Sequence, residues 1–250
     1  MWIVSIIVLI YAGCCAYLYF AQRSFIYFPV PASVNVPAED LRLDLDGATL
    51  QVWRLHAAKE HAVVYFGGNA ENVAHNVTQF ARLFPDKTVY LVNYRGYGAS
   101  TGSPTEAALF ADAQALFDRF RATHAGVSVV GRSLGSGVAV YLAATRSPDR
   151  VVLVTPYDSI ADLAQSSFPL FPVSALLKDR FESVDYAGDA TVPVLLLIAE
   201  RDEVIPRSSS QNLAAAIDSS LITVNIIGDA THNTIQDFAE YTDALGDFLE

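Results

Sequence analysis

Residues 127–144 read VSVVGRSLGSGVAVYLAA, a stretch in which an apolar, β-branched run leads directly into a small-residue, helix-forming run. The two runs meet at the pattern Gly-x-Ser-x-Gly, which is typical of a nucleophile elbow, a sharp strand-to-helix turn that exposes a serine. The strained backbone of this turn requires small neighbours, and Gly131 and Gly135 flank Ser133. We therefore predict a strand over 127–130, a nucleophile at Ser133 and a helix that begins at Leu134.

A second Gly-x-Ser-x-Gly pattern lies at Gly98–Gly102 and contains Ser100. It falls inside a glycine-rich loop, and the helix that follows begins only after Pro104. Because no strand enters this pattern and no helix leaves it directly, we interpret Ser100 as part of a turn. The alternative for Ser133 is a strand-to-helix junction of small residues without a chemical role.

Apolar runs alternate with amphipathic stretches along the rest of the chain, and Asp46-Gly47 is typical of a hairpin turn. The expected strands cover Leu41–Asp46, Leu50–His56, Ala62–Phe66, Thr88–Asn93, Val127–Val130, Val151–Thr155, Val194–Ala199 and Leu221–Ile227. The expected helices cover Glu71–Phe84, Thr105–Thr123, Leu134–Thr145, Pro206–Ile217 and about Thr234–Phe248. This alternation predicts an α/β fold with a mainly parallel, doubly wound sheet. Functional groups of such a sheet lie beyond the carboxyl ends of its strands.

A catalytic serine needs a general base and a group that orients the base, and in this fold class the chain order is Ser, Asp or Glu, then His. His232 is the only histidine after Ser133, and it follows the last expected strand. Asp202, which follows the strand Val194–Ala199, is the favoured carboxylate, and Asp158, after the preceding strand, is the alternative. We interpret the other candidates as loop, surface or packing residues: Glu200, Glu203, His56, His61, His75 and His124.

Two backbone N–H groups are needed to stabilise the oxyanion of a tetrahedral intermediate. Leu134, directly after the nucleophile, is in the usual position for one of them. The loop after Ala62–Phe66 contains Gly67-Gly68, which permit close approach of the backbone, and it opens a helix whose N-terminus favours negative charge. We assign the second donor to Asn69, with Ala70 as the next choice. A plain strand-to-helix turn is the alternative.

The N-terminal stretch from Trp2 to Phe20 contains no charged residue and is followed by Arg23. As a helix these roughly 19 positions are about 28 Å long, which is close to the hydrocarbon thickness of a bilayer. We predict a membrane anchor over residues 1–22 and a catalytic domain over residues 23–250, in a single-pass arrangement. A cleaved signal peptide is the alternative. The single positive charge of Arg23 favours the cytoplasmic side for the catalytic domain.

Composition argues against several classes of function. The formal net charge is −11, with 16 Lys and Arg against 27 Asp and Glu, which disfavours binding to nucleic acid and electrostatic docking onto anionic lipid. The only two cysteines are adjacent, Cys14 and Cys15, so the sequence contains neither a disulfide framework nor a Cys/His metal motif. We therefore expect a reaction without a metal ion or an organic cofactor. The oligomeric state is not indicated.

With these residues placed, the chain resembles the α/β-hydrolases, and most closely the BEM46/ABHD13/ABHD17-like serine hydrolases. The resemblance covers nearly the whole chain and is carried by SFIYFP at 24–29, GNA at 68–70, NYRGYG at 93–98 and GRSLG at 131–135. It implies the α/β-hydrolase fold, the triad Ser133, Asp202 and His232, and oxyanion donors at Asn69 and Leu134. The family's usual His-Gly-Asn loop is here Gly-Gly-Asn over 67–69, which implies the loss of a side-chain brace and slower turnover.

The segment from Pro156 to Thr191 is longer than a plain crossover and contains the apolar run FPLFPV at 168–173. It forms either a small cap over the pocket, within residues 156–191, or an ordinary helix-and-loop crossover. An apolar cap beside a membrane anchor favours a small-molecule or lipid acyl ester as the substrate. The leading hypothesis is an esterase, a lipase-like enzyme or a thioesterase that forms an acyl-Ser133 intermediate. A serine peptidase and a catalytically silent binding protein at the membrane are the alternatives.

Overall fold

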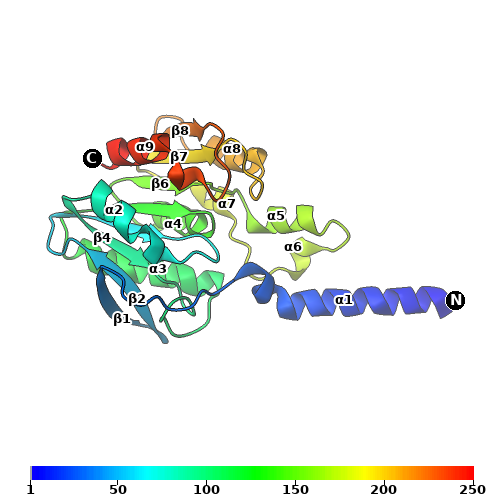
Figure 1. Ribbon diagram of the computed structural model, residues 1–250. Helices are drawn as coiled ribbons and strands as arrows, with labels where there is room; N and C mark the ends of the chain where they lie inside the picture. Colours follow the sequence, from blue (N-terminus) through cyan, green and yellow to red (C-terminus); the bar gives the residue numbers. More distant parts are fainter. Residues whose placement is uncertain (1) are drawn as a thin grey trace.

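Eight strands form one sheet in the part of the chain that the computed structural model describes, residues 2–250 (Figure 1). The strands are β1 (Glu39–Leu45), β2 (Ala48–Leu55), β3 (His61–Phe66), β4 (Lys87–Val92), β5 (Gly126–Arg132), β6 (Val151–Val154), β7 (Val194–Ala199) and β8 (Ile222–Ile227). Their order across the sheet is β1-β2-β4-β3-β5-β6-β7-β8. β2 pairs antiparallel with β1 and β4, whereas all the other pairs are parallel. The predicted α/β fold with a mainly parallel sheet is therefore confirmed.

The central parallel strands are buried on both faces, which is why they form continuous apolar runs in the sequence. Every residue of β6 and β7 is buried. The register aligns the carboxyl ends of neighbouring strands, since Phe66 of β3 pairs with Gly131 of β5, and Val154 of β6 pairs with Arg132 of β5. As a result, the loops after β3, β5, β6 and β7 lie at the same edge of the sheet.

Helices cover both faces of the sheet (Figure 1). One face packs α3, α4, α7 and α8 around an apolar cluster that includes Phe117, Leu142 and Leu213. The opposite face packs α2 and α9 around a second cluster that includes Phe80 and Tyr241. The bounds of these helices are α2 (Val77–Leu83), α3 (Glu106–Arg121), α4 (Leu134–Thr145), α7 (Ser183–Ala187), α8 (Arg207–Ala216) and α9 (Ala239–Leu249). The doubly wound arrangement is thus present.

Two of the expected helices begin later than the sequence pattern suggests. The first is preceded by a 3₁₀ turn, η1 (Val73–Asn76), because the Asn72 side chain accepts a hydrogen bond from the N–H of Ala74 and caps that turn. The second splits into η2 (Ile235–Asp237) and α9, because Phe238 between them has an extended backbone, with φ −91° and ψ 140°.

The helix α1 (Trp2–Ile26) projects from the body, and α5 (Ile160–Ser167) and α6 (Val173–Leu176) extend beside its inner end (Figure 1). By length and composition α1 is able to cross a membrane, and its most apolar window is not buried in the protein. The helix runs on to Ile26, and Gln22 within it is buried. The division of the chain into a membrane anchor, residues 1–22, and a catalytic domain, residues 23–250, stays a prediction. In the structure one continuous helix, α1, crosses the boundary between these two parts.

Candidate active site

Ser133 lies at the turn between β5 and α4, the position predicted for the nucleophile. Its backbone has φ 49° and ψ −115°, a conformation that residues with a side chain rarely adopt. The two flanking glycines make the turn sterically feasible. A Cβ atom on Gly131 would overlap the carbonyl oxygen of Gly135, and a Cβ atom on Gly135 would overlap that of Phe66. The two glycines of the Gly-x-Ser-x-Gly pattern over 131–135 are therefore required by packing alone.

The structure brings Ser133, Asp202 and His232 together at the carboxyl edge of the sheet, from the loops after β5, β7 and β8. His232 Nε2 lies 3.0 Å from Ser133 Oγ, and His232 Nδ1 lies 2.9 Å from Asp202 Oδ2. The side chains of His232 and Asp202 are only 7% and 5% exposed. A hydroxyl, an imidazole and a carboxylate in this order are able to transfer the hydroxyl proton to the imidazole and to stabilise the resulting imidazolium.

Asp202 is held as an ionised hydrogen-bond acceptor. Burial by itself raises the pKa of this carboxyl, but hydrogen bonds from His232 and from the backbone N–H groups of Ile205 and Val204 outweigh burial and lower the pKa below the usual 3.8. The two N–H groups donate to Oδ1 at 2.7 and 2.9 Å. Because an ionised carboxylate only accepts, the proton of the neutral imidazole is on Nδ1, and Nε2 presents its lone pair to Ser133.

The rival carboxylate and the rival serine both have structural partners instead. Asp158, which follows β6, is buried and accepts hydrogen bonds from Ser209 Oγ and, at 2.9 Å, from Asn212 Nδ2. Ser100 is buried in a turn, where its hydroxyl accepts a bond from one backbone N–H and donates one to a backbone carbonyl. Asp158 therefore fixes the packing of α8, and Ser100 fixes the turn that was interpreted as such from the sequence.

The four histidines that precede Ser133 are either packed against other parts of the chain or exposed at the surface. The ring of His56 lies 2.9 Å from the carbonyl oxygen of Ala81. His124 is buried, and His61 and His75 are exposed. These positions agree with the interpretation of all four as surface or packing residues.

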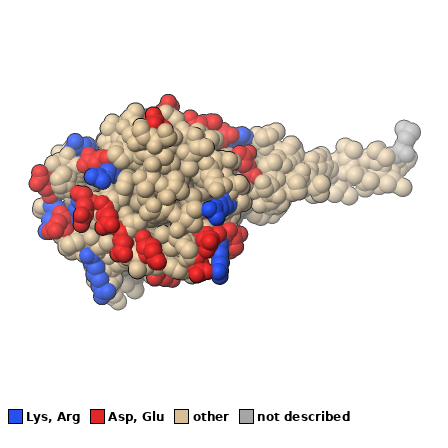
Figure 2. All heavy atoms as spheres, turned by 90° about the horizontal axis from the view of Figure 1, so that it is seen from above, with Lys and Arg blue, Asp and Glu red and all other residues tan. Residues whose placement is uncertain are grey.

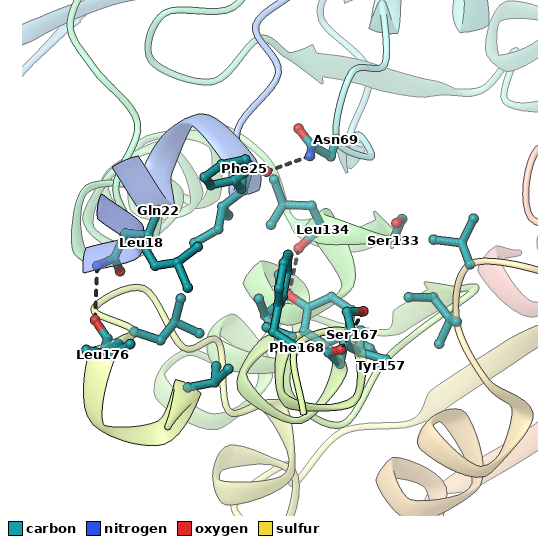
Figure 3. A pocket seen from close by; sticks show the side chains of 18 residues that line it. Leu18, Gln22, Phe25, Asn69, Ser133, Leu134, Tyr157, Ser167, Phe168 and Leu176 are labelled. Atoms are coloured by element: carbon teal, nitrogen blue, oxygen red, sulfur yellow. Dashed lines mark hydrogen bonds between the residues drawn. The ribbon is translucent and has the colours of Figure 1, made fainter. Parts of the chain in front are cut away.

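Asn69 and Leu134, the predicted oxyanion donors, line the same pocket as Ser133 (Figure 3). Within residues 2–250 neither backbone N–H donates a hydrogen bond to another group of the chain, so both are available to an oxyanion. The side chain of Asn69 turns away from Ser133: its Nδ2 donates to the carbonyl of Ile26 at 2.5 Å, and its Oδ1 accepts from the hydroxyl of Tyr97 at 2.7 Å. These bonds fix the loop and leave its main chain facing the pocket. The oxyanion role of Asn69 and Leu134 stays a prediction.

A buried ion pair braces the loop after β3. Glu71 Oε2 accepts hydrogen bonds from the N–H of Gly68 at 2.6 Å and from Arg132 Nη1 at 2.9 Å, and its Oε1 accepts from the hydroxyl of Tyr65 at 2.7 Å. The side chains of Glu71 and Arg132 are 11% and 12% exposed. Glu71 therefore braces this loop at Gly68 from within, although position 67 carries no side chain, and the expectation of slower turnover stays a prediction.

Both partners of this pair are charged. Burial by itself raises the pKa of Glu71, but Arg132 and the hydrogen bonds from Tyr65 and Gly68 outweigh it and hold the pKa below the usual 4.5. Burial likewise disfavours the Arg132 cation, but Glu71 more than compensates and raises its pKa. Arg132 Nη2 also donates to the carbonyl of His232 at 3.0 Å. The pair thus connects the oxyanion loop, the residue before the nucleophile and the histidine loop.

We expect Glu71→Gln to destabilise the fold by about 3 kcal/mol or more at neutral pH, because it leaves the buried Arg132 without a counter-charge. The folded pKa of Glu71 is depressed, so its stabilisation is complete above the unfolded value near 4.5 and is lost as the pH falls through the folded value. The difference in the free energy of unfolding between the wild type and the variant should therefore shrink in acid. Urea unfolding from neutral to strongly acidic pH measures this.

The matched control is Glu182→Gln, which removes a carboxylate from the half-exposed pair with Arg180. Because solvent screens that pair, the change should cost less than about 1 kcal/mol. Equal losses in the two variants, or a loss for Glu71→Gln that does not depend on pH, would contradict the structural role of the buried pair.

Two exposed residues, interpreted from the sequence as solvated loop charges, also hold the loop of His232. Glu203 Oε2 accepts a hydrogen bond from the N–H of His232 at 3.1 Å, and Glu200 Oε2 accepts one from the N–H of Asp229 at 3.0 Å. Because Arg132 Nη2 donates to the carbonyl of His232, both the N–H and the carbonyl of this residue are hydrogen-bonded. Both residues are exposed in a loop, as that interpretation has them, but it missed these bonds, since their partners come from a loop about 29 residues away, which neighbouring residues do not reveal.

An apolar pocket of about 340 Å³ opens onto Ser133 (Figure 3). None of its 18 lining residues is charged. The segment 156–191 contributes side chains from α5 and α6, among them Ile160 and Leu176, and α1 contributes others. A pocket of this size and polarity suits an uncharged, apolar group beside the reacting hydroxyl. Within residues 2–250 no group of three or more His, Cys, Asp or Glu side chains is arranged to hold a metal ion.

Comparison with known proteins identifies one matching family model and several relatives. Residues 61–172 match the family model described as alpha/beta hydrolase fold. The uncharacterized protein Rv2307c of Mycobacterium tuberculosis is 32% identical over 229 residues, which cover 86% of this chain and 82% of that protein. Protein bem46 of Schizosaccharomyces pombe is 29% identical, with 93% of this chain and 87% of that protein covered. The uncharacterized membrane protein YNL320W of Saccharomyces cerevisiae is 30% identical, with coverages of 92% and 85%.

Solved structures share the architecture at lower sequence identity. The esterase Pf2001 of Pyrococcus furiosus superposes with a TM-score of 0.67 at 18% identity, covering 89% of this chain and 95% of the esterase. An enol-lactonase from Burkholderia xenovorans LB400 superposes with a TM-score of 0.66 at 18% identity, covering 84% of this chain and 99% of the lactonase. At such identities the likeness demonstrates a common fold and nothing about substrate.

Proposed function

This chain belongs to the α/β-hydrolase family, and on that premise we propose that it is a serine hydrolase that cleaves carboxylic esters or thioesters through an acyl-Ser133 intermediate. The observation that carries the proposal is the continuous line of hydrogen bonds from Asp202 through His232 to Ser133. These side chains lie 30 and 99 residues apart along the chain and converge at the carboxyl edge of the sheet. Burial of the carboxylate and the imidazole excludes most of the water that would weaken such a line.

Acylation proceeds by attack of Ser133 Oγ on the carbonyl carbon of the substrate, while His232 Nε2 takes the hydroxyl proton. The backbone N–H groups of Asn69 and Leu134 stabilise the oxyanion that forms. Asp202 stabilises the imidazolium through Nδ1 and remains ionised throughout. The tetrahedral intermediate then collapses, the bond to the alcohol or thiol breaks, and His232 returns the proton to the leaving group.

Deacylation repeats these steps with water as the nucleophile. His232 takes one proton from the water as its oxygen attacks the acyl-Ser133 carbonyl, and the same two N–H groups stabilise the second oxyanion. Collapse releases the carboxylic acid and returns the proton to Ser133 Oγ. This chemistry uses only groups of the chain, the substrate and one water molecule.

We further propose that α1 holds the protein at a membrane as a single-pass anchor, with residues 23–250 as the catalytic domain and α5–α6 as its cap. The length and apolar composition of α1 support this, and one relative, from Saccharomyces cerevisiae, is named as a membrane protein. Arg23, which follows the apolar stretch, favours the cytoplasmic side for the catalytic domain. Alkaline carbonate extraction of the full chain distinguishes an anchored protein, which stays with the membrane, from a peripheral one.

Covalent labelling with a fluorophosphonate tests the reaction. We expect the probe to modify Ser133 in the full-length protein and to abolish ester hydrolysis, because the activated hydroxyl attacks phosphorus as it attacks a carbonyl. An activated ester should also release its leaving group in a burst when deacylation is the slower step. Absence of label on the wild type, or equal label on Ser133→Ala, refutes the proposal.

Two further outcomes separate the alternatives. If amides with the same acyl chain are cleaved as fast as esters, the protein is a peptidase. If the wild type is folded and membrane-bound but neither labelled nor active on any ester, thioester or amide, the site is catalytically silent.

A further inference from the structure

The pocket beside Ser133 has one wall that comes from the apolar helix α1. Leu18, Gln22, Phe25 and Ile26 of that helix line the cavity together with residues of α5 and α6. Figure 3 shows Leu18, Gln22 and Phe25 on one side of the cavity, with Phe168 and Tyr157 facing them. The same helix that is able to span a membrane therefore also encloses the space next to the nucleophile.

A second hollow continues from this pocket along α1. It measures about 390 Å³ and lies between the outer turns of α1, from Ile10 to Leu18, and the segment from Phe168 to Phe171. Leu18 and Phe168 line both hollows, so the pocket and the groove adjoin at these two side chains. The pocket and the groove together form one continuous track. It follows α1 from Phe25 to Ile10, a length of about 22 Å at 1.5 Å per residue. It runs from Ser133 into the part of α1 that carries no charge.

The α5–α6 segment is fixed to α1 by specific bonds. The Tyr11 hydroxyl donates to the carbonyl of Leu170 at 2.9 Å, and the Tyr11 ring stacks on Phe171 with ring centres 5.6 Å apart. Buried Gln22 donates to the carbonyl of Leu176 at 3.0 Å and accepts from the N–H of Lys178 at 2.6 Å. These contacts make the two walls of the track a single unit, so the track is a feature of the fold and does not require a rearrangement.

The outer part of the track is lined by uncharged side chains, whereas the molecule as a whole is acidic; at the inner end, Lys178 Nζ lies 3.9 Å from the centre of the Tyr19 ring. In Figure 2 the red and blue residues gather on the body, and the projecting arm formed by α1 is free of both colours. Residues 163–177 contain no charged side chain either, and Leu170 at the tip of the segment is 81% exposed. The apolar surface of this tip and of the helix beside it has a lower free energy in contact with hydrocarbon than in contact with water.

We propose that the track binds the acyl chain of a membrane lipid ester, which enters sideways from the bilayer between α1 and the α5–α6 segment and places its ester carbonyl at Ser133. The proposal rests on the proposed function and names its substrate class, a neutral long-chain glycerolipid. An acyl chain that follows α1 stays in apolar surroundings along its whole path, so no step exposes it to water. The absence of charge from the pocket lining matches an uncharged chain.

The test is Leu18→Trp, which puts an indole at the junction of the pocket and the groove. The full-length protein in lipid nanodiscs is assayed with butyryl and palmitoyl esters of glycerol. We expect the palmitoyl-to-butyryl ratio of kcat/KM to fall by about tenfold or more, since a chain that cannot pass the junction loses its binding surface. Because Leu18 lines the pocket, the butyryl ester rate is measured in each variant as the reference for the ratio, and fluorophosphonate labelling reports whether Ser133 stays accessible.

Leu9→Trp is the matched control, because Leu9 is exposed on α1 and does not line either hollow. It should leave the chain-length ratio as in the wild type. An unchanged ratio in Leu18→Trp, or an equal fall in both variants, overturns the proposal. A higher kcat/KM for an S-palmitoyl peptide than for the glycerolipid overturns the choice of a lipid ester.

A binding readout separates this proposal from the proposed reaction. A palmitoyl glycerolipid with a diazirine near its carboxyl end is photolysed with Ser133→Ala protein, which cannot turn it over. Cross-links to Leu134, Tyr157 and Leu163 are expected, since bulk lipid does not reach these pocket residues, and Leu18→Trp should suppress them. Their absence overturns the acyl site. If the cross-links form but the wild-type protein hydrolyses no ester, the acyl site is retained and the proposed reaction is rejected.

Discussion

Ser133→Ala is expected to reduce kcat for ester hydrolysis by about 10⁴- to 10⁶-fold, because it removes the atom that forms the acyl intermediate. The small residual rate would come from the oxyanion donors and from substrate binding alone. The fold should be retained, since the change deletes one hydroxyl whose only side-chain partner within residues 2–250 is His232 Nε2. Pre-steady-state kinetics with an activated butyryl ester measure both the burst and the turnover, and thermal unfolding reports on the fold.

Ser100→Ala is the control for this prediction, because it makes the same chemical change in the second Gly-x-Ser-x-Gly pattern. The hydroxyl of Ser100 accepts from the N–H of Gln51 at 2.8 Å and donates to the carbonyl of Asn93 at 2.9 Å. Its loss should lower the free energy of unfolding by about 1 to 3 kcal/mol, since buried main-chain groups lose their partner. Turnover of the folded protein should remain. If turnover survives in Ser133→Ala and vanishes in Ser100→Ala, then Ser100 is the nucleophile and Ser133 is not.

Asp202→Asn is expected to lower kcat by about 10⁴-fold while leaving the fold in place. The amide nitrogen is a donor, so it favours the imidazole tautomer with the proton on Nε2, which cannot accept a proton from Ser133. The imidazolium also loses its counter-charge. Steady-state kinetics across pH give the size of the loss. Because the pKa of Asp202 lies below 3.8 in the folded protein, the wild type should show no loss of activity from protonation of this carboxyl at mildly acidic pH.

Asp158→Asn tests the same change at the rival carboxylate. Asp158 Oδ1 accepts from the hydroxyl of Ser209 and the N–H of Ser159, and none of its partners is His232. We expect reduced stability with kcat close to that of the wild type. A loss of turnover in Asp158→Asn that exceeds the loss in Asp202→Asn would reverse the assignment of the acid.

The position of α1 has a consequence for the oxyanion loop as well as for substrate binding. The helix ends at Ile26, whose carbonyl accepts from Asn69 Nδ2, and the N–H of Phe28 donates to Asn69 Oδ1 at 2.9 Å. The connector after α1 therefore bonds directly to the loop that carries one proposed oxyanion donor. Variants that shorten α1 are informative only where the residues from Leu18 onward are retained, because these form the wall of the pocket.

Much of the fold was predictable because its signals are local. Buried parallel strands require continuous apolar runs, and the run Val127–Val130 followed by small residues defines both a strand and the helix after it. The strand ends also located the groups that we propose react, since parallel strands align their carboxyl ends at one edge. What the sequence did not reveal is where a side chain far along the chain takes part, as at Glu71, whose brace depends on Arg132.

The sequence by itself determined the class of fold, the elbow at Ser133 and the order in which a carboxylate and a histidine must follow it. These are properties of neighbouring residues and of chain order, which folding does not change. Only the tertiary structure showed that Asp202, and not Asp158, contacts His232, revealed Glu71, Arg132 and Glu203 as supports of the candidate site, and made α1 a wall of the pocket. Such contacts join residues up to 159 positions apart, and their geometry exists only after the sheet has set the directions of the loops.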